Sequence, residues 1–109
     1  MSWEESIEQE LAKASEGLKN GNAGLARVCA RRAVAFAAQH WAEQHNLPGW
    51  QGDAMHQLHQ IQGEPTLPLS VREAAQRLLT KVTEQTKMPM TTDPIADTHL
   101  ILNYFHSTM

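Results

Sequence analysis

One stretch of the sequence, residues 23–45 (AGLARVCARRAVAFAAQHWAEQH), constrains the fold more than any other. At 100° per residue, its apolar side chains occupy two adjoining helical faces rather than one. The first face carries Leu25, Val28, Cys29 and Phe36, and the second carries Ala26, Ala30, Ala33, Ala37 and Trp41. This arc is much wider than the roughly 100° stripe of a surface helix. The pattern therefore predicts a central helix with neighbours on two sides, and its apolar breadth predicts a homodimer.

Two arginines on this helix are candidate ligand-binding residues. The helical pattern places Arg27 and Arg31 on a narrow outer strip with Ala38 and His45. Guanidinium groups four residues apart on one face are suited to a nucleotide phosphate or a nucleic-acid backbone. The alternative is a solvated strip that holds no ligand.

A third arginine, Arg32, falls among the apolar residues, on the side that also carries His40 and Glu43. A guanidinium on a buried face must be paired and hydrogen-bonded, because desolvating an unpaired charge is costly. One interpretation is an acid/base constellation of these three residues in a small nuclease or nucleotide-processing enzyme. The other is a polar network that fixes the register of the helices.

The remaining sequence predicts further helices and no strands. Apolar residues recur every three or four positions in four other segments, at residues 3–19, about 53–62, 70–86 and 94–106. Ser2 and Ser70 each precede a Glu by three residues, which is the pattern of a capping box, and Asp53 is a further cap. We therefore expect one domain over residues 1–109, an all-α up-and-down bundle of four main helices and one short helix.

Composition narrows the function classes. The chain has 109 residues, 41% of them apolar, and a net charge of −3, so it has no general attraction for nucleic acid or anionic membranes. No apolar run approaches the ~18 residues of a membrane span, and the acidic start MSWEESIEQE has no signal-peptide character. We expect a cytoplasmic protein that does not contact a membrane. The single cysteine, Cys29, excludes an internal disulfide and is expected to be packed.

His56 and His59 form an H-x-x-H pair on the short helix and are candidate metal ligands. Residues three apart on a helix converge on one ion, with His40 or His45 as a third ligand. The alternative is a chance pair in a chain with six histidines. The sequence contains no Gly-rich phosphate loop and no H-E-x-x-H signature, so no cofactor is expected.

Residues 11–41 resemble the first helical hairpin of the HEPN family (higher eukaryotes and prokaryotes nucleotide-binding domains). The matching residues are Leu11, Ala12, Lys13, Ala14, Leu18, Gly21, Ala26, Ala30 and Ala33. The stretches SVREAAQRLLTKV and PIADTHLILNYF resemble the last two helices of that family. The resemblance implies a small helical bundle.

The chain departs from the ribonuclease members of that family. They carry an Arg, four to six residues and then a His near the start of the last helix, and neither His99 nor His106 has such an Arg before it. The resemblance thus implies a degenerate member that binds a nucleotide, pairs with itself or docks a partner. Our leading hypothesis is a non-catalytic interaction module, a homodimer with a protein partner, which contacts nucleotide or RNA through Arg27 and Arg31.

A second resemblance competes with the first. Residues 17–37 are similar to one tetratricopeptide hairpin, with Gly17, Ala26 and Ala33 at the small-residue positions. A tetratricopeptide array needs about three repeats with a period near 34 residues. Residues 53–86 do not repeat the pattern, so a tandem array is not favoured.

Overall fold

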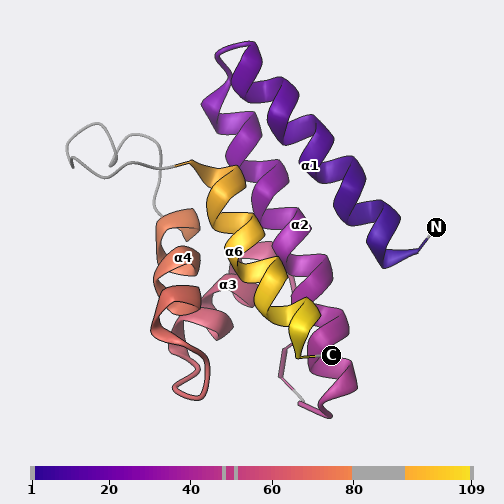
Figure 1. Cartoon of the computed structure of the whole chain (residues 1–109), viewed down its shortest axis with the longest axis vertical. Coiled ribbons are helices and arrows are strands. Elements are labelled where there is room, and N and C mark those ends of the chain that lie inside the picture. Colours follow the sequence, from indigo (N-terminus) through magenta and orange to yellow (C-terminus); the bar gives the residue numbers. More distant parts are fainter. Residues whose placement is uncertain (1, 48, 51, 80–92, 109) are drawn as a thin grey trace.

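The computed structural model describes residues 2–47, 49–50, 52–79 and 93–108. These residues contain no strand, and their helices are α1 (Trp3–Lys19), α2 (Ala23–Gln44), α3 (Ala54–Gly63), α4 (Leu69–Leu79) and α6 (Pro94–Ser107). Helices α1 and α4 run in one direction, and α2 and α6 run in the other (Figure 1). The predicted all-α up-and-down bundle is confirmed. The predicted extension of α4 over residues 80–86 lies outside the described residues.

The helix starts follow from side-chain capping. Ser2 Oγ accepts a hydrogen bond from the Glu5 backbone N–H at 3.1 Å, and three further caps act in the same way. These are Asn22 for α2, Asp53 for α3 and Asp93 for α6. The predicted cap at Ser70 is wrong, because α4 already begins at Leu69. The Pro68 carbonyl opens that helix by accepting hydrogen bonds from Val71 and Arg72.

Helix α2 lies at the centre of the bundle, as the sequence predicted. Helix α1 packs along one side of it, and α6 and α3 pack along others (Figure 1). Its small side chains allow close approach. A Cβ added at Gly17 of α1 would lie 3.2 Å from the backbone N of Ala26 and 3.2 Å from the backbone O of Asn22. The α1–α2 hairpin therefore depends on glycine at that position.

Aromatic packing closes one end of the core. The Trp41 ring lies 5.4 Å from the Trp50 ring and 5.0 Å from the Phe105 ring, measured between centroids. Trp41 Nε1 also donates a hydrogen bond to Thr108 Oγ1 at 2.8 Å. These contacts join the end of α2 to the following loop and to the end of α6. Over the described part of the chain, every helix is too short or too polar to cross a membrane.

Candidate functional site

Arg27 and Arg31 point into the bundle rather than outward. Arg27 Nη1 donates to the Arg77 carbonyl at 3.2 Å, and Arg31 Nε donates to the Leu78 carbonyl at 2.6 Å. Both acceptors lie in the last described turn of α4, and each backbone carbonyl accepts a charge-assisted hydrogen bond from a guanidinium group. Arg27 is 2% exposed and Ala38 is fully buried, so the predicted outer strip is wrong. These two backbone carbonyls of α4 draw the arginines inward.

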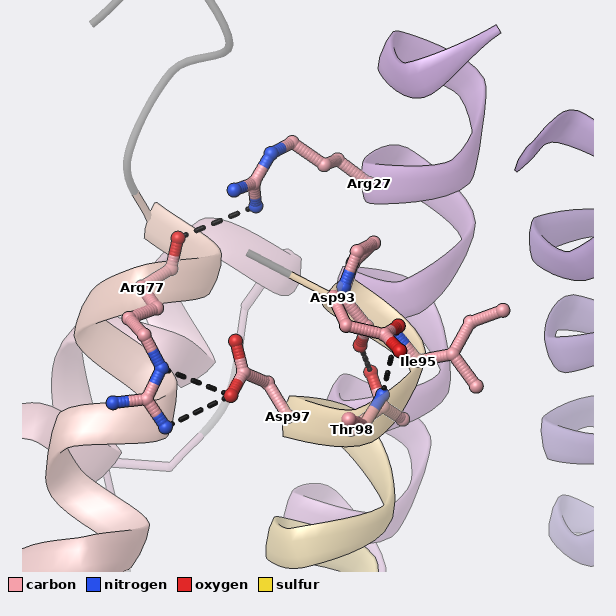
Figure 2. Close-up of polar contacts among 8 residues, drawn as sticks. Arg27, Arg77, Asp93, Ile95, Asp97 and Thr98 are labelled. Atoms are coloured by element: carbon pink, nitrogen blue, oxygen red, sulfur yellow. Dashed lines mark hydrogen bonds and ion pairs between the residues drawn. The ribbon is translucent and has the colours of Figure 1, made fainter. Parts of the chain in front are cut away.

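The third helix at this position, α6, contributes a carboxylate (Figure 2). Arg77 Nε lies 2.9 Å from Asp97 Oδ1, and Arg77 Nη2 lies 2.8 Å from the same oxygen. The start of α6 holds Asp97 in place, because Asp93 Oδ1 accepts hydrogen bonds from the Ile95 and Ala96 backbone N–H groups. We call Arg27, Arg31, Arg77 and Asp97 the arginine junction. It connects α2, α4 and α6.

The arginine junction holds more positive than negative charge. Burial lowers the pKa of Arg27, and the nearby Arg31 lowers it further, while Asp97 acts in the opposite direction. The hydrogen bond to Asp97 raises the pKa of Arg77. Arg27 Nη2 and Asp97 Oδ2 are both buried and have no hydrogen-bond partner among the described residues. The geometry favours a structural role for Arg27 and Arg31 in binding α4, rather than a phosphate clamp open to solvent.

The enzyme hypothesis needs Arg32, His40 and Glu43 in one cleft. His40 stacks on Trp3 with the ring centroids 4.3 Å apart. His40 and Glu43 line a shallow hollow together with Trp3, Phe36 and Gln39, and Arg32 is not part of that lining. Arg32 is exposed, so its predicted placement on a buried face is wrong. The structure therefore does not bring the three residues into one cleft.

The histidine candidates are also separated. His56 Nε2 lies 3.2 Å from the Gly49 carbonyl, and His45 Nε2 lies 3.0 Å from the Thr108 carbonyl. His59 is exposed on α3, and His40 lies against Trp3. Among the residues that the structure describes, no three His, Cys, Asp or Glu side chains gather as a metal site requires. His56 and His59 thus lack a third ligand there.

Cys29 is packed, as predicted. It is 1% exposed and lies between α2 and α1. Burial raises the pKa of its thiol, and the adjacent Glu10 carboxylate raises that pKa further. A thiol with a raised pKa is a poor nucleophile at neutral pH, because the thiolate is the reactive form.

Two surfaces of the described part of the chain are open and were not predicted from the sequence. One is the outer face of α2, which we define as Leu25, Val28, Arg32, Phe36, Gln39 and Glu43, all exposed. The other is a groove between α1 and α6. The spacing of three and four residues along α2 was the signal for the first surface, but its apolar members were assigned to the core. The groove had no signal, because its walls lie far apart in the sequence.

The chain was also compared with known proteins. No family model, no curated protein and no solved structure matches it. The HEPN and tetratricopeptide resemblances therefore stay predictions.

Proposed function

We propose that this chain is a non-catalytic interaction module that pairs with a second copy of itself through the outer face of α2. The observation that carries this proposal is the apolar area left on α2 once the other helices have packed. Leu25 is 44% exposed, and Val28 and Phe36 are each 38% exposed. The buried members of the wide apolar arc are covered within the chain, so this face is the apolar part of α2 that remains for a second copy. An HEPN-like identity belongs to the same proposal, supported by the α1–α2 hairpin in an all-α bundle.

The outer face of α2 is complementary to itself in charge. Consider two copies of α2 packed antiparallel, with the two-fold axis midway between Phe36 and Gln39. Each Arg32 then lies opposite the Glu43 of the other copy, because the two positions are equally far from the axis. A two-fold interface requires such self-complementary pairs.

The size of the outer face of α2 sets the affinity that we expect for the dimer. One face of one helix buries less than the roughly 1,200–2,000 Å² of a stable complex, which places the dimer in the weak, reversible class. Ion pairs at an exposed interface contribute only about 0–1 kcal/mol each. We therefore expect dissociation on dilution and in high salt.

Sedimentation across a concentration series tests the proposal. We expect the native chain to dimerise, Phe36→Ser to sediment as a folded monomer, and Arg32→Glu and Glu43→Arg each to weaken the dimer. The double variant Arg32→Glu/Glu43→Arg should restore it, because the pair is re-formed with its charges exchanged. Glu16→Arg, an exposed position on α1, is the matched control and should leave the dimer unchanged. A native chain that stays monomeric, or a dimer indifferent to all these variants, would refute the proposal.

The nucleic-acid alternative is tested in the same experiment. A mixed pool of nucleotides and short RNA is added to the native chain. A dimer whose sedimentation ignores the additions supports the interaction module, in line with the inward position of Arg27. A monomer that shifts on addition would overturn the proposal in favour of nucleotide or RNA binding.

A further inference from the structure

The groove between α1 and α6 is not part of the outer face of α2. Helix α1 packs along α2 and has few contacts with α6, and both helices lie beside α2 (Figure 1). The open volume between them is about 240 Å³. Its lining residues are Trp3, Glu4, Ile7, Glu8, Ala37, His99, Leu102, Asn103, Phe105 and His106.

The groove combines an apolar floor with an acidic wall. Ile7, Ala37 and Phe105 are buried residues at its base. Glu4 and Glu8, four residues apart on α1, provide the carboxylates of the wall. Neither has an ion-pair partner among the described residues. A carboxylate in the first turn of a helix is favoured by the helix dipole, but this accounts only for Glu4. Glu8 lies beyond the first turn, and its charge is available to a cation from outside the chain.

The size of the groove selects the kind of occupant. Pockets for small molecules occupy about 300–1,000 Å³ and enclose most of the ligand, whereas this groove is smaller and open along its length. It suits a row of apolar side chains presented by a helix. A helix lying between α1 and α6 would complete a four-helix arrangement with α2 at its base. The carboxylates of α1 repel phosphate groups, which disfavours nucleic acid.

We propose that this groove binds an amphipathic helix of a partner protein, with aliphatic residues on one face and Lys or Arg along the edge next to α1. The aliphatic residues cover Trp3 and Leu102, the half-buried apolar residues of the lining, and basic residues one turn apart pair with Glu4 and Glu8. Carboxylates four positions apart on α1 are one turn apart in space, which matches that repeat. Glu4, Glu8 and Asn103 of this site are not part of the outer face of α2, so variants at these positions test the groove without changing the dimer surface.

Calorimetric titration with two synthetic helices tests this inference on the full chain. One peptide carries Leu on one face and Lys on the other, and the second has the same Leu positions with Glu in place of Lys. We expect the Leu/Lys peptide to bind and the Leu/Glu peptide not to bind. Binding should quench or shift the fluorescence of Trp3, and a Trp3→Phe variant identifies that signal among the three tryptophans.

Matched variants separate a specific site from general attraction between an acidic protein and a basic peptide. Glu4→Gln/Glu8→Gln should weaken binding about tenfold, the order expected for two ion pairs at the rim. Glu5→Gln/Glu16→Gln removes the same charge from α1 outside the groove and should change binding less than twofold. Asn103→Trp, at an exposed wall position, should fill the groove and abolish binding with an unchanged circular dichroism spectrum.

Several outcomes would overturn the inference: no binding of the Leu/Lys peptide, equal binding of the Leu/Glu peptide, or equal weakening by the two glutamine pairs. A folded Asn103→Trp variant that still binds would also overturn it. Sedimentation of the same variants shows whether they still dimerise. We expect the dimer to be unchanged, because none of the substituted residues belongs to the outer face of α2.

Discussion

Arginine side chains on the two sides of helix α2 have opposite environments. Arg31 and Arg32 are neighbours in the sequence, yet Arg31 donates to the Leu78 carbonyl while Arg32 is exposed. The arginine junction lies on the inner side with three cations and one carboxylate, and the outer face mixes half-exposed apolar residues with Arg32 and Glu43. The surroundings of an arginine side chain therefore decide its role. The inner side should determine folding, and the outer face should determine association.

The largest loss of unfolding free energy is expected from Asp97→Ala. This change removes the carboxylate of the arginine junction and leaves its three guanidinium groups without a compensating negative charge. Breaking a buried pair from one side costs about 3 kcal/mol of unfolding free energy, measurable by urea denaturation. Asp93→Ala is the matched control on the same helix and should cost about 1 kcal/mol through loss of the cap. Equal losses in the two variants would contradict the importance of the junction.

The next largest change in unfolding free energy distinguishes Arg31 from its neighbour Arg32. Arg31→Ala removes a charged hydrogen bond to α4 and should lower the free energy of unfolding by about 2 kcal/mol. Arg32→Ala should change it by no more than about 0.5 kcal/mol, as expected for an exposed site, while weakening the dimer in sedimentation. Similar stabilities for both variants would show that the inner and outer sides of α2 do not differ as described.

The smallest effect concerns pH and the Cys29 thiol at the α1–α2 contact. The pKa of this thiol is raised in the folded chain, so the unfolded chain loses the proton first as pH rises. Its contribution to stability is therefore complete below the ordinary thiol pKa of about 8.5 and is lost above it. The unfolding free energy of the native chain relative to Cys29→Ala should fall between pH 8 and 10. A constant difference over that range would contradict the burial of a neutral thiol.

Much of the fold was predictable because its signals are local. Periodic apolar residues located the helices, and the Ser2 and Asp53 caps lie next to the helices that they begin. The breadth of the apolar arc on α2 correctly placed that helix at the centre. The start of α4 was missed by one residue because the Pro68 carbonyl, rather than the Ser70 side chain, opens it.

The candidate sites were less predictable. A helix with apolar residues on most sides has no unique inner face, so Leu25 and Phe36 were assigned to the core and Arg27 to the surface. The groove between α1 and α6 joins residues almost a hundred positions apart, which no local pattern reveals.

What the sequence determined by itself was the set of helices and the central place of α2, because hydrogen bonding and apolar periodicity act within a few residues. What only the tertiary structure decided was how α2 is rotated about its own axis, and so which of its faces is buried. Its alanines allow neighbours on several sides, and the backbone carbonyls of Arg77 and Leu78 on α4 are the partners that draw Arg27 and Arg31 inward. Those partners come from distant segments, so the choice between the buried and the open face of α2 exists only in the folded chain.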